Sequence, residues 1–411
     1  MASRQDRLRP PKVLIFDSYY ATLGGNQRYI GMLLNADGWG WRPALCCPGD
    51  GDLTKAARES GAEVHIVRQS PRLDRGRSAL KGAGFVDKLL TAFAILSYNI
   101  KLARALRRIG PDILQCHSTR NVVMTGLAAF LAGVPLVLFI KGEMNTPLLD
   151  RLALMLARTT IFLTDELRPP SRRAIKDKYP ENSPTLPIGI PMHDVDAAEH
   201  RVVTTPPAGI TRERHTVSFV FAGWLVETKG IHRLIEAFID VHGNHPNTRL
   251  LIAGTSNDES YRRTLQGLVE NSGVGDAVTF LGWRDDILDV IAASDVYVLP
   301  SFTEGVPRSI VEAMALGKPV IATTVGGIPS LLGQGEFGIL CPPDDASSLA
   351  SAMSRMVQDD RLGRDIGLAA RKAARNRYTF QAHLVGLSDI LRNSIKSIEK
   401  SNSSGETATV S

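Results

Sequence analysis

Short apolar strands alternate with amphipathic helices along this 411-residue chain, and the alternation occurs twice. Strands that are apolar throughout are typical of parallel sheets covered by helices on both faces. The first series predicts strands at Lys12–Asp17, Ala44–Cys47, Val64–Val67, Ile113–Cys116, Leu136–Phe139 and Thr160–Leu163. The second predicts strands at Ser218–Ala222, Arg249–Ala253, Val278–Leu281, Val296–Leu299 and Val320–Ala322. The chain is therefore expected to form two α/β domains, each Rossmann-like with a doubly wound parallel sheet.

A Pro- and Thr-rich stretch, 202–209, is predicted to link the two domains. The first domain is expected at 11–205 and the second at 206–377, which agrees with the chain length. Thr379 is a suitable cap for a last helix over 378–399. The polar ends, 1–10 and 400–411, are predicted to be disordered.

Charge is divided unevenly between the two halves. Residues 1–205 contain 28 Lys and Arg against 19 Asp and Glu, whereas residues 206–411 contain 20 against 23. A basic half favours an anionic partner, with ordinary surface charge as the alternative. The loop Arg68–Lys81 is basic, and the helix expected at Phe85–Leu106 carries apolar residues at helical spacing, namely Leu89, Phe93, Leu96, Ile100 and Leu106. We interpret this stripe as facing the core, and the basic loop as the better indication of an anionic surface.

Targeting and metal-binding signals are weak. The first ten residues are charged and lack the apolar core of a signal peptide. No run of about 18 uninterrupted apolar residues predicts a membrane-spanning helix, and Leu127–Ile140 is better interpreted as a helix end followed by a buried strand. The cysteines, Cys46, Cys47, Cys116 and Cys341, lie in or beside strands without CxxC spacing. We therefore expect buried thiols in a reducing, cytoplasmic compartment, and no zinc site.

The segment Pro300–Pro329, PSFTEGVPRSIVEAMALGKPVIATTVGGIP, carries the clearest functional signal. A strand leads into a turn with Glu304 and Gly305, and Pro307 stands where a helix begins. This arrangement favours an anion site, because free N–H groups and the helix dipole point at the same spot. Glu312 lies in the apolar run of that helix, where a carboxylate needs a partner. The pattern indicates binding of a phosphate beside a polyol; the alternatives are a solvated turn residue and a structural Arg–Glu pair.

The spacing of Glu304 and Glu312 resembles the E-x7-E motif of retaining glycosyltransferases of family 4, which have the GT-B fold. The patterns PS-x-x-EG-x-P, EAMA-x-G-x-PV and GG-x-P are similar to that family in the same order. Gly223 after its strand and Lys229-Gly230 resemble the family's strand–turn–KG segment. The likeness covers roughly residues 12–390 and is weaker in the first half, where Gly24-Gly25 and Leu114–Ser118 fall at the family's site loops.

The resemblance implies two domains facing a cleft, with a C-terminal helix that crosses back to the first domain. It implies transfer of a sugar from a nucleotide-diphosphate sugar to a glycan or lipid-linked hydroxyl acceptor, in surface polysaccharide or glycolipid biosynthesis. Retention of anomeric configuration is implied, with no cofactor, no metal and no nucleic-acid partner. The implied location is the cytoplasm, with a peripheral position on an anionic membrane surface through the basic first domain.

Residue roles follow from the matching positions. Glu304 is implied to bind sugar hydroxyls, Glu312 the nucleotide ribose, and Lys229 the diphosphate, whose negative charge grows as it leaves. His117 is implied to contact the sugar near the reacting carbon, so Glu304, His117 and Lys229 form the implied catalytic group. The remaining implied donor-binding positions are Gly24, Gly25, Gly223, Gly305, Val306 and Arg308.

Four positions depart from the family pattern. Trp224 stands where the family has a phosphate-binding Arg, and Ser330 where it has a second Glu. Lys141 replaces the His of an HG pair, and Ile188 the Asn of an NG pair. The alternatives are a non-catalytic partner subunit that binds a glycan or nucleotide sugar, and a nucleotide-sugar epimerase of similar fold. A nicotinamide-dependent oxidoreductase is disfavoured, because no G-x-G-x-x-G follows the first strand.

Overall fold

The computed structural model describes residues 9–21, 24–74, 84–142, 144, 146–168, 183–210 and 215–406. The chain forms two compact units. Unit 1 comprises Met1–Phe162, Arg168–Leu186 and Leu384–Ser411, and unit 2 comprises Leu163–Leu167 and Pro187–His383. The main division thus falls at 186/187, whereas the sequence pattern placed it at 205/206.

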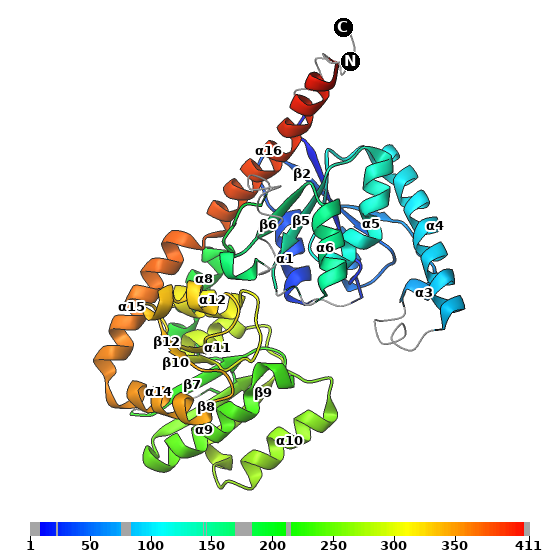
Figure 1. The fold of residues 1–411 in the computed structure, drawn as a ribbon. Coiled ribbons are helices and arrows are strands. Elements are labelled where there is room, and N and C mark those ends of the chain that lie inside the picture. Colours follow the sequence, from blue (N-terminus) through cyan, green and yellow to red (C-terminus); the bar gives the residue numbers. More distant parts are fainter. Residues whose placement is uncertain are drawn as a thin grey trace. The chain divides into compact units, whose positions relative to one another are not determined.

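Unit 1 contains a six-stranded parallel sheet in the order β3-β2-β1-β4-β5-β6. Its strands are β1 (Lys12–Phe16), β2 (Arg42–Cys47), β3 (Glu63–Ile66), β4 (Ile113–Cys116), β5 (Leu136–Ile140) and β6 (Thr159–Phe162). Its helices are α1 (Gly25–Leu34), α2 (Asp52–Glu59), α3 (Pro71–Asp74), α4 (Phe85–Ile109), α5 (Thr119–Ala132) and α6 (Pro147–Leu156). Strands β1, β4, β5 and β6 are buried along their whole length, as expected of a sheet covered on both faces (Figure 1).

Unit 2 contains a second six-stranded parallel sheet, in the order β12-β11-β10-β7-β8-β9. Its strands are β7 (Val217–Ala222), β8 (Thr248–Ala253), β9 (Val278–Gly282), β10 (Val296–Leu299), β11 (Val320–Thr323) and β12 (Ile339–Cys341). Its α-helices are α8 (Met192–Thr204), α9 (Ile231–Asn244), α10 (Glu259–Glu270), α11 (Ile287–Ala293), α12 (Arg308–Ala315), α13 (Ile328–Leu331), α14 (Ala346–Gln358) and α15 (Asp360–Arg377). Short 3₁₀ turns include η3 (Asp165–Leu167) and η5 (Glu227–Lys229).

The predicted fold class is confirmed, because both sheets are parallel and doubly wound and all eleven predicted strands are present. Strand β12 was not predicted; it has three residues, too few to show a period. Helix α8 extends to Thr204, so the first residues of the predicted linker 202–209 are helical. The end residues 1–8 and 407–411, and Arg75, Arg77 and Lys81 of the basic loop, lie outside the described residues.

The last helix, α16 (Phe380–Glu406), begins after Thr379, whose Oγ1 accepts a hydrogen bond from the Ala382 amide at 3.2 Å. From Leu384 onward its residues belong to unit 1. There Trp41 Nε1 donates to Ser388 Oγ at 2.9 Å, and Ser394 Oγ lies 2.8 Å from Thr159 Oγ1. The helix therefore packs on the first sheet domain, and it runs beyond its predicted end at 399 (red in Figure 1).

Two further expectations have different outcomes. The four cysteines are free and buried, as predicted, and burial raises the pKa of Cys46 and of Cys116 to about 12.

The core-facing interpretation of the α4 stripe is wrong for four of its five residues, because Leu89, Phe93, Leu96 and Ile100 are exposed and only Leu106 is buried. The buried face is set by another row that includes Tyr98 and Leu102. By length and composition Val86–Ile109 is also apolar enough to cross a membrane, which the sequence pattern did not indicate.

Candidate functional site

The carboxyl edge of the unit 2 sheet brings together the segments that the sequence singled out. Gly223 and the turn η5 follow β7, the turn containing Glu304 follows β10, and Gly326-Gly327 follows β11. Strands β7, β10 and β11 are neighbours and parallel, so their carboxyl ends lie at one edge. Ligands of open α/β sheets bind at this edge.

Glu304 and Lys229 form a close ion pair at this edge. Lys229 Nζ donates to Glu304 Oε1 at 2.5 Å, and Ser301 Oγ donates to the same oxygen at 2.9 Å. The Glu304 side chain is 9% exposed and that of Lys229 is 25% exposed. Among the described residues no donor reaches Glu304 Oε2. The cluster thus offers a fixed acceptor oxygen and a cation that are both reachable from solvent.

Close backbone contact at Gly230 fixes Lys229 against β10. Gly230 has φ +65°, and a Cβ placed there would lie 2.1 Å from the carbonyl oxygen of Pro300. The amide of Phe302 donates to the Thr228 carbonyl at 2.8 Å. Only glycine combines this conformation with this approach, so the KG pair of the sequence has a direct structural reason.

The glycine pair after β11 packs in the same way on the Glu304 turn. Gly326 has φ +54°, and a Cβ there would lie 1.9 Å from the Glu304 carbonyl oxygen. The Gly327 amide donates to the Gly305 carbonyl at 2.8 Å. The backbone of the Glu304 turn is therefore held from both sides.

Helix α12 starts beside this turn. Pro307 is its N-cap, and no side chain among the described residues caps its first amides. Val306 is buried next to it. Arg308 and Glu312, both partly buried, pair within α12 with Nη2 3.4 Å from Oε1. The partner that Glu312 was expected to need is thus Arg308, and the uncapped helix start can receive an anion.

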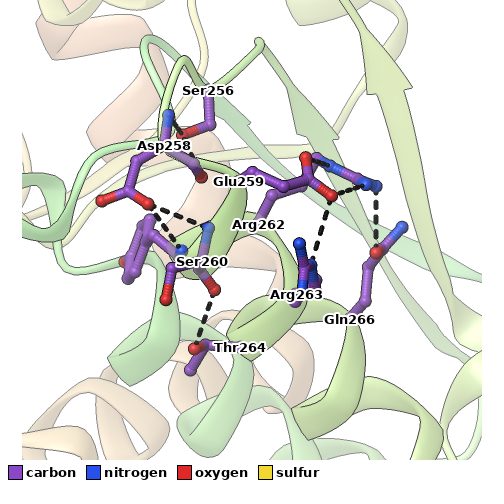
Figure 2. Close-up of polar contacts among 9 residues, drawn as sticks. Ser256, Asp258, Glu259, Ser260, Arg262, Arg263, Thr264 and Gln266 are labelled. Atoms are coloured by element: carbon purple, nitrogen blue, oxygen red, sulfur yellow. Dashed lines mark hydrogen bonds and ion pairs between the residues drawn. The ribbon is translucent and has the colours of Figure 1, made fainter.

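Helix α10, which follows β8, has a start that is capped by a side chain, in contrast to the start of α12. Asp258 Oδ1 accepts from the amides of Ser260 and Tyr261 at 2.9 and 3.1 Å (Figure 2). The side chain of Glu259 is bound by Arg262 and Arg263, and these contacts, with that of Arg262 the strongest, lower its pKa to about 2. This helix start is already satisfied by its own side chains, so α12 is the better anion site.

An aromatic pair occupies the place of the missing arginine. Trp224 follows β7 and is 41% exposed, and Trp283 follows β9 and is 47% exposed. Their ring centroids are 6.0 Å apart with the planes tilted by 51°. The pair presents flat apolar surface at the same sheet edge, where an Arg would have presented charge.

Two residues at this edge were missed by sequence reasoning. Ser301 is fully buried and orients Glu304. Tyr297 is fully buried in β10, and its hydroxyl donates to the Ala222 carbonyl at 3.3 Å. Burial raises the pKa of Tyr297, and the charges of Glu304 and Glu312 raise it further. Ser301 lies within the PS-x-x-EG pattern, which is the signal that could have identified it.

In unit 1, a buried carboxylate organises the loops after β1 and β4. Asp17 is fully buried and accepts hydrogen bonds from Gln27, Asn26 and Asn121 side chains at 2.9, 3.1 and 3.2 Å. Gly24 is the N-cap of α1, with its amide donating to Gln27 Oε1 at 3.1 Å, and Gly25 is the first helical residue. The network was not predicted, although Asp17 ends the first predicted strand.

His117 is buried by side chains of unit 1. Lys141 Nζ lies 3.2 Å from His117 Nδ1, 2.9 Å from Asn26 Oδ1 and 3.3 Å from the centroid of the Tyr29 ring. The amide nitrogen of Gln115 lies 3.0 Å from His117 Nε2, while Gln115 Oε1 is buried without a partner among the described residues. Turning the Gln115 amide by half a turn lets Oε1 accept from Nε2–H and satisfies both groups.

These contacts favour one tautomer of His117. Asn26 Oδ1 also lies 3.3 Å from His117 Nδ1, but this oxygen already accepts from Lys141 at 2.9 Å. Since a lysine ammonium can only donate, the Lys141 contact at 3.2 Å makes Nδ1 an acceptor and places the ring hydrogen on Nε2. The departure at Lys141 therefore has a function in unit 1, since it orients His117. Two more residues depart from the family pattern. Ile188 is buried, and Ser330 Oγ donates a hydrogen bond to Glu166 within unit 2.

The described residues contain no group of three or more His, Cys, Asp or Glu side chains placed to hold a metal ion.

Comparison with known proteins identifies the unit 2 domain. Residues 211–373 match the family described as Glycosyl transferases group 1. The match spans 163 of the 411 residues, all of them within the range of unit 2. It is 33% identical over 147 residues to an N-acetyl-alpha-D-glucosaminyl L-malate synthase of Bacillus anthracis, covering 36% of this chain and 38% of that protein. It is 33% identical over 162 residues to a lipopolysaccharide core biosynthesis glycosyltransferase of Rhizobium meliloti, covering 39% of this chain and 46% of that protein.

The alignments with these two relatives each span less than half of the relative's length. A solved structure of the Anabaena protein HepE in complex with UDP is similar over nearly the whole chain. It has a TM-score of 0.71 at 19% identity and covers 96% of this chain and 100% of the other. The likeness at this identity shows that the two proteins share a fold.

The close approach at Gly230 predicts a large cost for a small side chain. Gly273, between α10 and β9, has a similar φ of +73° but open space around its Cβ position, so it is a matched control. We expect Gly230→Ala to lower the free energy of unfolding by about 3 kcal/mol or more, and Gly273→Ala by about 1 kcal/mol. Urea unfolding of both variants measures the difference, and equal losses would show that backbone conformation alone matters at Gly230.

The His117 tautomer can be observed directly. Nitrogen-15 chemical shifts of the imidazole should show the hydrogen on Nε2 in the parent protein. Lys141→Met removes the donor to Nδ1, so we expect the ring of that variant to populate both tautomers. Lys372→Met, on the exposed side of α15, is the control. A parent ring with its hydrogen on Nδ1 would contradict the assignment.

Proposed function

We propose that this chain is a retaining glycosyltransferase of family 4. It moves a hexosyl or related sugar from a nucleotide-diphosphate sugar to a hydroxyl acceptor. The observation that carries the proposal is the Lys229–Glu304–Ser301 cluster beside the uncapped start of α12, in a group 1 domain. A cation, a fixed carboxylate and free helix amides are the groups that a leaving diphosphate and a sugar require.

The chemistry follows from these groups. The bond between the anomeric carbon and the diphosphate oxygen breaks, and the acceptor oxygen bonds to that carbon from the same face. The acceptor proton passes to the leaving phosphate oxygen, so charge and atoms balance. Lys229 and the amides at the start of α12 stabilise the negative charge that grows on the diphosphate.

Binding of the diphosphate changes the pairing of Glu304. In the structure Lys229 and Ser301 both occupy Oε1. When Lys229 turns to the phosphate, Oε1 loses one of its two donors, and both carboxylate oxygens can then accept sugar hydroxyls while Ser301 still donates to Oε1. Ser301 keeps the carboxylate in place through this exchange. Lys229 and Glu304 are therefore the catalytic residues proposed in unit 2, with Gly223, Gly305, Val306 and Arg308 as donor-binding residues.

Donor recognition uses two further features. Glu312 is proposed to bind the ribose, and the Trp224–Trp283 pair offers a surface on which a nucleobase or sugar ring can stack. Because the similar HepE structure contains UDP, uridine nucleotides are the first donor class to test. In unit 1, Gly24 and Gly25 stay predictions as donor-binding residues, and His117 stays a prediction as a catalytic residue. No metal or other cofactor is part of the proposal.

The proposed acceptor is a glycan or a lipid-linked hydroxyl compound in surface polysaccharide or glycolipid biosynthesis. The relative named for lipopolysaccharide core biosynthesis supports this class. We propose a cytoplasmic location, with the chain on the cytoplasmic face of a membrane. A non-catalytic partner subunit is the alternative that the loss of Arg at Trp224 favours, and repeated turnovers by purified protein would exclude it.

Donor binding and stereochemistry provide the first test. A uridine-diphosphate sugar at about 100 times its dissociation constant should stabilise the protein by about 2.7 kcal/mol and raise its melting temperature. Glu312→Ala should remove that shift. With an acceptor alcohol, the proton NMR coupling of the new anomeric centre should show the donor's configuration. An inverted product would exclude the retaining mechanism, and no thermal shift with UDP-, GDP-, ADP- or dTDP-sugars would favour the partner subunit.

Lys229→Met tests the charge on the diphosphate. We expect the transfer rate to fall by about 100-fold or more, the usual loss when one aimed donor is removed from a developing anion. Lys372→Met is the matched control and should keep the parent rate. Initial rates at saturating donor measure both. A Lys229→Met variant with the parent rate would show that the α12 amides suffice without this cation.

A further inference from the structure

The segment Leu163–Leu167 packs on the loops of the proposed site. It follows β6 along the chain, yet it belongs to unit 2, and it contains the 3₁₀ turn η3. Leu163 and Leu167, at its two ends, are both buried. Its middle residues are therefore held in place from both ends.

Thr164 lies against Gly327, the second glycine of the pair after β11. A Cβ placed on Gly327 would lie 3.1 Å from Thr164 Oγ1, which is itself buried. The same Cβ would lie 3.0 Å from the Gly305 carbonyl oxygen and 2.8 Å from Val306 Cγ2. Gly327 is thus enclosed by the segment and by the turn that contains Glu304, and no side chain fits between them.

Glu166 makes the second contact of the segment. Ser330 Oγ donates a hydrogen bond to Glu166 Oε1. A hydrogen bond to a carboxylate is stronger than one between neutral groups. A carboxylate therefore lies beside position 330 although the chain has a serine there, and it comes from a residue 164 positions earlier.

A short path connects this contact to Glu304. Ser330 is in α13, a single turn whose N-cap is Gly327 and whose last residue, Leu331, is buried. The Gly327 amide donates to the carbonyl of Gly305, the neighbour of Glu304, at 2.8 Å. A displacement of Ser330 therefore reaches Glu304 through two glycines.

We propose that Glu166 is a positioning residue of the donor site. Its carboxylate takes the place of the glutamate side chain that the family pattern has at 330. Through Ser330 and Gly327 it holds the turn where Glu304 can bind the sugar. The inference rests on the proposed function for the role of Glu304, but the position of the glycine turn can be measured without any sugar transfer.

An ordinary surface hydrogen bond is the alternative. Glu166 is exposed, and an exposed pair by itself contributes little to stability. The positioning role is favoured because the same segment also encloses Gly327 through Thr164, and because Leu167 is buried directly after Glu166. The two interpretations differ at the Gly327 amide, which a surface hydrogen bond would not affect.

Hydrogen exchange of the Gly327 amide tests the position of the turn. We expect Glu166→Ala to raise the exchange rate of this amide about fivefold, the usual effect of one lost hydrogen bond. The Gly254 amide, which donates to the Gly282 carbonyl at 2.8 Å in the same unit, should exchange as in the parent.

Two further variants control this measurement. Glu166→Gln keeps an oxygen that accepts from Ser330 Oγ, so the Gly327 amide should exchange near the parent rate. Glu270→Ala removes another exposed carboxylate of unit 2, at the end of α10, and should have no effect.

A reciprocal exchange separates this contact from general damage. Ser330→Glu alone places two carboxylates side by side, and their repulsion should raise the exchange rate of the Gly327 amide. Adding Glu166→Ser restores one hydroxyl and one carboxylate, so the double variant should return toward the parent rate. A second change that repairs the first is expected only of residues that act on each other.

The same variants connect the contact to sugar transfer. Glu166→Ala should lower the transfer rate at saturating donor by about tenfold or more, because reaction rates are sensitive to small misplacements of groups around the substrate. Glu166→Gln, the double variant and Glu270→Ala should keep most of the parent rate. A parent with the expected Gly327 exchange but no transfer would refute the proposed function and leave Glu166 as the residue that positions the turn.

Three outcomes would overturn the inference. One is a Gly327 amide that Glu166→Ala leaves unchanged. Another is a double variant Glu166→Ser/Ser330→Glu whose Gly327 amide exchanges as fast as in Ser330→Glu alone. The third is a Glu166→Gln variant as impaired as Glu166→Ala, which would assign the effect to the negative charge and not to the position of the turn.

Discussion

The close contact of three backbone loops at the carboxyl edge of the second sheet is the constraint on which the proposed site depends. Gly230 brings the turn after β7 against the end of β10, and Gly326 brings the turn after β11 against the Glu304 carbonyl. A side chain at either position would separate the loops. Because these backbones are in contact, the sheet fixes the positions from which Lys229, Ser301 and Glu304 reach one another.

In the proposed mechanism, the partly buried ion pair of Lys229 and Glu304 changes partners when the donor binds. A buried charge whose partner leaves is costly, so Lys229 and Glu304 hold each other until a diphosphate replaces the carboxylate. Ser301 lowers the cost of the exchange, because its hydroxyl stays on Oε1 when the ammonium moves. In unit 1 the Lys141 ammonium group also makes two contacts: it orients His117 through Nδ1, and it lies over the face of the Tyr29 ring.

Structural features that depend on a local sequence pattern could be predicted. Continuous apolar runs predicted eleven strands, and the matched motifs included Gly230, Gly326 and Gly327, although the loop contacts at these glycines were not predicted. The three-residue β12 was too short to show a period. Contacts between residues distant in sequence, such as Asp17 with Asn121 and Lys141 with His117, could not be predicted, because they are created by strand order. Replacement of a motif residue, as at Trp224, indicated that a position had changed but not what its side chain would contact.

Helix α4 shows a further limit of periodicity. A row of apolar residues at helical spacing indicates that one face is apolar, and the usual inference is that this face is buried. When two rows are apolar, the period cannot tell which row the sheet will cover. In α4 the sheet domain covers the row of Leu102 and Leu106, and the row of Leu89 and Phe93 faces solvent. Packing on the sheet domain therefore accounts for the inner row of α4, and it does not account for the apolar composition of the outer row.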